Sequence, residues 1–379
     1  MKAIVGGKIW HGGSLKEAHL LVDGGKILSV GGEIPSEAEV LDAAGRILYP
    51  GFIDAHSHIG VDEEIIGKAG DDTNEGSSPL SPQIRAIDGV NIYDGQFKEA
   101  LAGGVTTVAT GPGSANVFGG TFVAIKTHGS YIDEMVVKEP VAMKAALGEN
   151  PKRVYGKQRK YPMTRMSIAA LFREAIEETR AYELRKNAGT GIYHQQWESL
   201  LPVAGRHLPV KIHAHRADDI ATAIRLAEEL HLRYTIEHAT EAALLLDLLK
   251  EKGVSLCIGP TFGVKSKEEL RNKTFRTAAL LEERGIPFAI ITDCPVLPQG
   301  SLTLQAKHYV QAGLSPRGAT EAITSAPAKI LGIDHRVGAL EAGKDADVVC
   351  MAAELFTAPY EEVLWTMVNG QVVYQREKN

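Results

Sequence analysis

The chain has 379 residues, of which 44% are hydrophobic and 23% charged, a balance that excludes disordered and fibrous proteins. Its formal net charge of −6 is mild and long runs of like charge are absent, so nucleic acid and membrane surfaces are not expected as partners. A small-molecule substrate is expected instead, and homo-oligomerisation stays open. Three widely separated cysteines show no disulfide or structural-zinc spacing, which favours a reducing, cytoplasmic location.

The two ends of the chain are predicted to be rich in β-strands. Residues 1–49 contain short apolar runs separated by Gly-Gly and Asp-Gly turns, without a helical pattern. Residues 337–379 have the same character, and Asn369-Gly370 marks a hairpin turn. Because neither half is large enough for a stable sheet, we expect both to pair into one small β-sandwich domain.

The region between them, residues 50–336, alternates apolar strands with amphipathic helices, which is typical of a parallel α/β sheet. One such helix is predicted at 217–231, with Asp218 as its N-cap. Eight strands with a helix after each predict a closed TIM (β/α)8 barrel, although the pattern also fits an open doubly wound sheet. The strands are expected at residues 51–56, 104–110, 122–127, 140–147, 209–215, 234–239, 254–259 and 287–293.

Two long segments interrupt this repeat. Residues 67–81, after the first strand, are rich in Ser, Pro, Gly and Asp. Residues 147–208 contain a basic loop at 149–162 and a long amphipathic helix around 166–186, where one βα connection would need about half that length. Because both segments follow strand ends, they are candidate lids over a site on that face.

Histidines stand at the ends of three predicted strands. His56 and His58 close the first strand, and residues two apart in a strand project to the same side, so both can reach one metal ion. His213 and His215 close the fifth strand. His238 closes the sixth, about one βα unit later, which places it at the same height.

Two further residues complete the pattern. Asp293 ends the eighth strand, next to the first strand once a barrel closes, with a helix N-cap as the alternative interpretation. Imidazoles and a carboxylate on one rim fit zinc or a similar divalent ion, such as iron, cobalt or manganese. Lys144 lies inside an apolar strand, where a buried cation is costly, so it should be paired, deprotonated or modified.

These residues together resemble a known family. The chain resembles the amidohydrolase superfamily, specifically its imidazolonepropionase-like and prolidase-like branch, over nearly its whole length. The resemblance implies a TIM barrel with its site on the carboxyl-terminal rim, and hydrolysis of a C–N bond, in an amide or cyclic amide, by a metal-activated hydroxide. The motifs that carry it are PGFIDAHSH, Lys144, His213, His238, Asp293, GALEAGKDADVV and VNGQVVY.

The resemblance also implies roles for single residues. Asp293 would be the catalytic acid/base that moves a proton from water to the leaving nitrogen. Lys144, as a carbamate, would bridge two ions. His213 is favoured over His215 as a ligand, and His215 would support the site or contact substrate. The implied metal sites are His56, His58 and Asp293 for one ion, and His213 and His238 for the second.

Recognition of the substrate is less constrained by the sequence. Because arginine suits the capture of a carboxylate, we expect a small substrate that bears one. A solvated surface role is the simpler interpretation for each single candidate. The candidate substrate-binding residues are Asn116, His128, Glu149, Asn150, Lys152, Arg153, His215 and Arg216.

Three alternative functions stay open. A dipeptidase or prolidase-like enzyme and a heterocycle deaminase of the same superfamily would use the same metal chemistry. Lys144 favours the dinuclear hydrolases, because the mononuclear deaminases typically lack a bridging lysine. The third alternative, a catalytically inactive barrel that acts as a binding protein, is opposed by the complete set of ligands.

Overall fold

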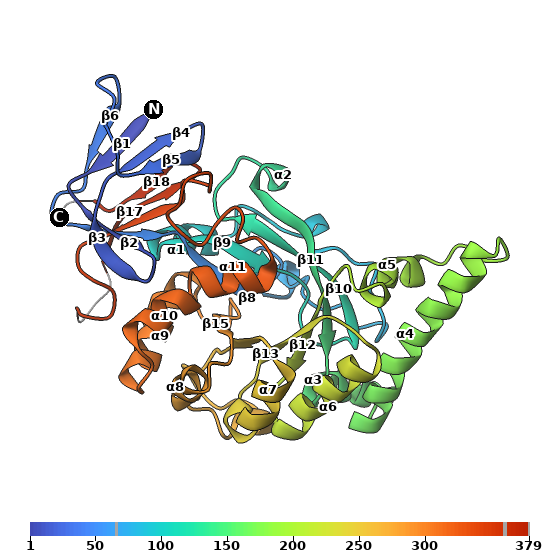
Figure 1. Ribbon diagram of the computed structural model, residues 1–379. Coiled ribbons are helices and arrows are strands. Elements are labelled where there is room, and N and C mark those ends of the chain that lie inside the picture. Colours follow the sequence, from blue (N-terminus) through green and yellow to red (C-terminus); the bar gives the residue numbers. More distant parts are fainter. Residues whose placement is uncertain (65–66, 359–361, 378–379) are drawn as a thin grey trace.

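A computed structural model describes residues 1–64, 67–358 and 362–377 (Figure 1). Its largest sheet has eight strands arranged in chain order, and they lie at the eight predicted positions. The strands are β8 (Phe52–Ser57), β9 (Val105–Thr110), β10 (Phe118–Lys126), β11 (Val136–Ala146), β12 (Val210–Ala214), β13 (Tyr234–His238), β14 (Leu256–Ile258) and β15 (Phe288–Ile290).

This sheet is nearly closed into a barrel. The main-chain N–H of Asp293, just after β15, donates to the carbonyl of His56 in β8 at 3.2 Å. The N–H of His58 donates to the carbonyl of Cys294 at 2.8 Å. The carboxyl ends of β8 and of β12 to β15 therefore meet at one rim, as in a TIM-like barrel.

Strand β10 departs from the expected barrel, because it runs antiparallel to both β9 and β11. No helix separates β9 from β10, and only the single turn α2 (Ile132–Met135) separates β10 from β11. The prediction of a helix after each strand is thus wrong here. An apolar run predicts a buried strand, but it carries no information on the direction of that strand.

The other helices follow the strands and cover the outside of the sheet (Figure 1). They are α1 (Gln96–Ala102), α3 (Glu149–Lys157), α4 (Arg165–Asn187), α5 (Gln195–Ala204), α6 (Ala217–Glu229), α7 (Leu246–Lys252), α8 (Arg276–Glu283), α9 (Leu302–Gln311), α10 (Pro316–Ala322) and α11 (Ser325–Leu331). No helix in the described ranges is both long and apolar enough to cross a membrane.

Two local predictions need correction. The basic segment expected as a loop at 149–162 forms helix α3 over its first part. Helix α6 begins after Arg216 as its N-cap, so Asp218 lies in the first turn and is not the cap. There its carboxylate still favours the helix, because the amino-terminal end of a helix dipole attracts negative charge.

Helix α4 confirms the long helix predicted around 166–186. Thr164 and Ser167 cap its start reciprocally, each side chain accepting the backbone N–H of the other. The helix projects at the right of Figure 1, away from the β-rich ends of the chain.

The chain ends form two further sheets. The first contains β1 (Lys2–Val5), β4 (Leu20–Asp23), β5 (Lys26–Val30) and β6 (Glu39–Asp42). The second contains β2 (Lys8–His11), β3 (Ser14–Glu17), β7 (Ile47–Pro50), β16 (Val348–Met351), β17 (Val363–Val368) and β18 (Gln371–Gln375), so both ends of the chain share it. One apolar cluster takes residues from both sheets, including Ile4, Ile9 and Val348. The sandwich arrangement itself stays a prediction.

A buried ion network ties β10 of the barrel to the segment that leads into β16. The Lys126 ammonium contacts Asp347 and lies 2.9 Å from a carboxylate oxygen of Asp345, and all three side chains are almost fully buried. Arg336 and Lys26 also pair with Asp345, at 2.9 and 2.5 Å. Burial alone raises the pKa of Asp345, but these cations outweigh it and hold the pKa below its usual value.

We expect Lys126→Met to lower the free energy of unfolding by about 3–5 kcal/mol at pH 7, because it removes the buried cation that contacts Asp347 and one of the three cations that contact Asp345. The lowered pKa of Asp345 means that its stabilising contribution is present above the ordinary carboxyl pKa and is lost as the pH falls through the lowered value. Urea unfolding should therefore show that the variant has a much lower free energy of unfolding than wild type at pH 7, and that this difference is smaller near pH 3. An equal deficit at both pH values would contradict this account.

Candidate metal centre

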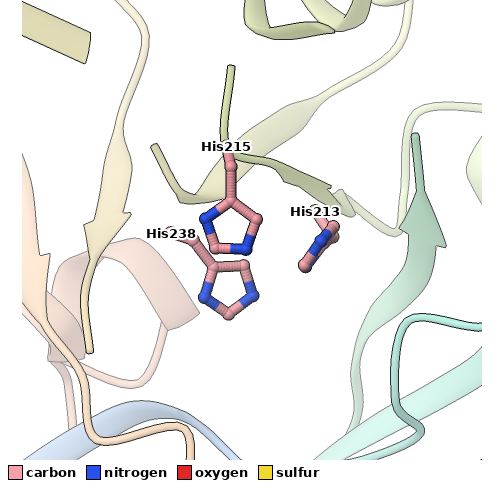
Figure 2. Close-up of side chains that lie close together, drawn as sticks. All are labelled: His213, His215 and His238. Carbon is pink, nitrogen blue, oxygen red and sulfur yellow. The ribbon is translucent and has the colours of Figure 1, made fainter. Parts of the chain in front are cut away.

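The histidines predicted as ligands converge at the carboxyl rim of the barrel. The ring centroids of His56 and His58 lie 5.3 Å apart, and those of His56 and His238 lie 5.1 Å apart. Figure 2 shows the ring of His215 stacked on that of His238, with His213 edge-on beside them. The centroids of His213 and His238 are 4.4 Å apart. Three strands, β8, β12 and β13, thus bring five imidazoles together.

Asp293 lies at the same centre. One of its carboxylate oxygens, Oδ1, is 3.2 Å from Nε2 of His58 and 3.5 Å from Nε2 of His56. Burial raises the pKa of this carboxyl, but His238, His58 and Lys144 outweigh that effect and lower the pKa to about 2. The side chain is therefore an anion at neutral pH that faces the Nε2 atoms of His56 and His58.

The hydrogen bonds of the imidazoles fix which ring nitrogen is available. Nδ1 donates to a carbonyl oxygen in His58 (Gly111, 2.7 Å) and in His238 (Gly259, 2.8 Å). In His56, Nδ1 donates to the Glu237 carboxylate at 2.8 Å. With Nδ1 engaged in this way, each ring turns Nε2 toward the centre, and this is the nitrogen that can bind a metal.

Burial also keeps the imidazoles neutral. Desolvation is the largest effect on His56, His213, His215 and His238, and with the positive charge of Lys144 it lowers each pKa well below the ordinary value. A neutral imidazole can offer a lone pair, whereas an imidazolium cannot.

The residues present fit a divalent cation. Oδ1 of Asp293 is buried and makes no hydrogen bond within the described ranges, so it is an anionic oxygen in need of a partner. Asp293 and His238 both have left-handed backbone, with φ values of 55° and 69°, a strain that commonly marks functional sites. Two ligand sets arise with atoms within 4.8 Å of one another: His56, His238 and Asp293, and His213, His215 and His238.

Lys144 is fully buried beside this centre. Its Nζ lies 3.2 Å from Nε2 of His56. Burial lowers its pKa to about 8, although Asp293 and Glu237 act in the opposite direction. A low pKa increases the fraction of neutral amine, the form that reacts as a nucleophile. Carbamylation of Lys144 stays a prediction.

Of the candidate substrate residues, Asn150 and His215 lie at the centre. The Asn150 amide donates to Nε2 of His213 at 3.2 Å, and Nδ1 of His215 lies 2.8 Å from the Thr240 hydroxyl. The backbone N–H of Glu149 donates to the Glu269 carboxylate at 3.2 Å. The first turn of α3 therefore lies against the ligand cluster.

The remaining candidates are placed away from the centre. His128 lies beyond the end of β10, and because β10 is antiparallel this is the opposite end of the barrel. The amide of Asn116 donates to the carbonyls of Glu75 and Ser78 and so braces the segment 67–81. Arg216 pairs with the exposed Asp218 at 2.8 Å. Lys152 and Arg153 are exposed on α3.

Cys294, beside Asp293, is a buried thiol as expected. Its Sγ donates to Gln96 at 3.5 Å, and burial raises its pKa, so it does not form a thiolate nucleophile. It and the other two cysteines, Cys257 and Cys350, are free and buried.

Sequence reasoning missed the charged residues that support the centre. Glu237 accepts from His56 and also from Lys211, whose Nζ is 2.8 Å away, and all three side chains are buried. Glu237 and Lys211 lie inside apolar strands. They therefore carry the signal that singled out Lys144, a charged residue within an apolar run.

Asp54 is a third such residue. One of its oxygens, Oδ2, accepts from Thr292 and Gln299, while Oδ1 accepts from the N–H of His56 at 3.1 Å. Burial dominates and raises its pKa to about 6, despite these hydrogen bonds. Asp54 thereby fastens β8 to the segment that carries Asp293.

Comparison with known proteins agrees with this geometry. The model for the Amidohydrolase family matches residues 47–373. The solved structure of an amidohydrolase from Thermotoga maritima is 38% identical, covers 99% of this chain and 100% of that chain, and has a TM-score of 0.95.

Two relatives extend the comparison. Amidohydrolase tasK of Hapsidospora irregularis is 30% identical over 378 residues, which are 92% of this chain but only 38% of the length of that protein. An imidazolonepropionase of Thermoplasma acidophilum is 24% identical over 385 residues, 94% of this chain and 89% of that protein. With the family match spanning most of its length, this chain is a member of the amidohydrolase family.

Proposed function

We propose that this protein is a metal-dependent hydrolase that cleaves the C–N bond of an amide or cyclic amide in a small substrate bearing a carboxylate. Membership in the amidohydrolase family supports a hydrolase that acts on C–N bonds. The observation that carries the proposal is the convergence of neutral imidazoles on the unpartnered carboxylate oxygen of Asp293.

The residues have separate tasks in this proposal. His56, His58 and Asp293 hold one divalent ion, with zinc as the best match to nitrogen and carboxylate donors. His213 and His238 would hold the second, and a carbamate on Lys144 would supply a ligand to both ions. Such ions supply Lewis-acid chemistry, acting on a water and on the carbonyl under attack.

Asp293 is the proton carrier. It is ionised at neutral pH, so its carboxylate can accept a proton from the attacking water. The same carboxylate then returns the proton to the leaving nitrogen.

The substrate class rests on the cations near the centre. Lys267 donates to the side-chain oxygen Oδ1 of Asn150 at 2.9 Å, and the Asn150 side chain in turn contacts His213. This places an ammonium next to the ligand cluster, where Arg216 had been expected, and supports a carboxylate on the substrate. The similarity to an imidazolonepropionase supports a ring amide as the scissile group.

A substrate screen tests the activity directly. Cyclic amides, N-acyl amino acids and dipeptides would be incubated with zinc-loaded protein, and release of the new amine or acid measured. We expect turnover with a carboxylate-bearing cyclic amide. Turnover confined to dipeptides would favour the prolidase-like alternative, and metal-loaded protein inactive on all three classes would favour the inactive barrel.

We expect Asp293→Asn to reduce kcat on the best substrate by about 10²- to 10⁴-fold, because the amide cannot carry the proton. The exposed Asp334→Asn serves as the matched control and should keep wild-type turnover. Steady-state kinetics with metal content measured on the same samples separates loss of metal from loss of proton transfer. Full turnover by Asp293→Asn would refute its assignment as the proton carrier.

Metal analysis tests the dinuclear arrangement. Wild-type protein should contain about two equivalents of zinc-like metal per chain, as expected of two-metal sites. Lys144→Ala should lose the second equivalent because the bridge is gone, whereas Lys138→Ala, on the same strand but away from the rim, should keep both. Unchanged metal content in Lys144→Ala would rule out a bridging role.

A further inference from the structure

Glu269 is a buried carboxylate that the ligand assignments above leave unexplained. It lies in the 3₁₀ turn Glu268–Leu270, in the segment between β14 and α8. Its side chain is 1% exposed, whereas that of the adjacent Glu268 is 67% exposed. Burying a carboxylate is costly unless a partner compensates its charge.

The contacts of the two oxygens of Glu269 differ. Oε2 accepts the backbone N–H of Glu149 at 3.2 Å. Oε1 makes no hydrogen bond within the described ranges, and it lies 3.5 Å from Nζ of Lys267, 3.7 Å from Nε2 of His215 and 3.8 Å from Nε2 of His213. A carboxylate oxygen without a hydrogen bond to the described residues therefore faces the Nε2 atoms of two histidines.

These separations are those of atoms that share one ion. Nitrogen and oxygen ligands bound to a tetrahedral zinc at about 2.0–2.1 Å lie about 3.4 Å from each other. The two Nε2–Oε1 separations of 3.7 and 3.8 Å are a few tenths longer, which small side-chain rotations remove. Direct hydrogen bonds from a neutral imidazole would be shorter, at about 2.7–3.2 Å.

Charge leads to the same conclusion. The ligand set of His213, His215 and His238 contains only imidazoles, none of which is an anion. A dication in a buried site needs negative charge close to it, because charges away from water are stable only when compensated. Glu269 supplies an anionic oxygen beside two of these three rings.

We propose that Glu269 is a ligand of the second cation, which Oε1 binds together with His213 and His215. This inference rests on the proposed metal-dependent function and adds to it a ligand from the segment after β14. It also gives His215 a direct role that the sequence left between support and substrate contact.

The local backbone is built to admit this carboxylate. Gly148, which precedes α3, has a φ of 80°, and a Cβ there would lie 2.9 Å from Asp219 and 3.3 Å from Oε2 of Glu269. Glycine at this position allows the turn into α3 to approach Glu269 and present the N–H of Glu149.

A simple ion pair with Lys267 explains the geometry less well. Nζ of Lys267 is 2.9 Å from the side-chain oxygen of Asn150 but 3.5 Å from Oε1 of Glu269. The second distance is longer than the roughly 2.7–2.9 Å of a charge-assisted hydrogen bond. Lys267 is also 23% exposed, so water already solvates part of its charge. Such a pair would not require the carboxylate to face two histidines.

Cobalt titration tests the proposal without any substrate. Full-length protein freed of metal by chelation would be titrated with Co²⁺, followed by calorimetry and by visible absorption, which reports the ligands of the ion. Wild type should show two binding events. Glu269→Gln should lower the affinity for the second Co²⁺ ion at least tenfold and change the absorption spectrum of that ion. The affinity for the first ion should stay within about twofold of the wild-type value.

Two control variants separate the explanations. Glu268→Gln, at the exposed neighbouring position, should behave as wild type. Lys267→Met should leave the second event unchanged or tighten it, because it removes a positive charge from the site. A Lys267→Met variant that weakens the second event as much as Glu269→Gln would overturn the proposal, since the ion pair alone would then matter.

The remaining outcomes are decisive as well. If Glu269→Gln binds both ions with wild-type affinity and spectrum, Glu269 is not a ligand, and the proposed hydrolase function stands. If wild type binds no Co²⁺, both the inference and the function fall. Should Glu269→Gln not fold, Glu269→Asp is used instead, because it moves the carboxylate back by one methylene. Weaker binding of the second Co²⁺ ion by this variant supports the proposal. Unchanged binding of that ion contradicts it.

Discussion

The structure depends on one constraint: polar groups removed from water must be compensated. His56, His213 and His238 are buried at the rim of the barrel beside Asp293, and one carboxylate oxygen of Asp293 makes no hydrogen bond to the described residues. The Nε2 atoms of His56 and His213 face Lys144 and Asn150, each at 3.2 Å. Hydrogen bonds on the far side of each ring fix the tautomer but do not satisfy these inner atoms. A bound cation is the partner that satisfies nitrogen lone pairs and an anion at once.

The surrounding network makes this arrangement rigid. Glu237 orients His56 and is itself held by Lys211. The buried Lys211 is thus linked to the ligand cluster through Glu237. Asp54 joins the first strand to the segment of Asp293, on the opposite edge of the sheet. Such outer partners position ligands and tune their affinity, so the centre extends well beyond the atoms that would touch a metal.

The sequence predicted the eight strands and the meeting of the histidine ligands with Asp293, because strand ends of a parallel barrel share one rim and apolar runs mark the strands. It failed for β10, since apolar patterning does not encode strand direction, and His128 was therefore placed at the wrong end. Glu237 could have been found from the sequence, because it is a charged residue within an apolar strand. Glu269 could not, because a charged residue in a polar loop looks solvated until the fold buries it.

The central claim is that buried imidazoles and carboxylates at the rim exist to hold divalent cations. Anomalous diffraction at the zinc absorption edge, from crystals of the zinc-loaded protein, tests it most directly. The account predicts strong peaks within about 2.0–2.2 Å of Nε2 of His56 and His58 and of the Asp293 carboxylate, with a second peak next to His213 and His238. A fully loaded crystal with zinc bound only elsewhere on the protein would contradict it.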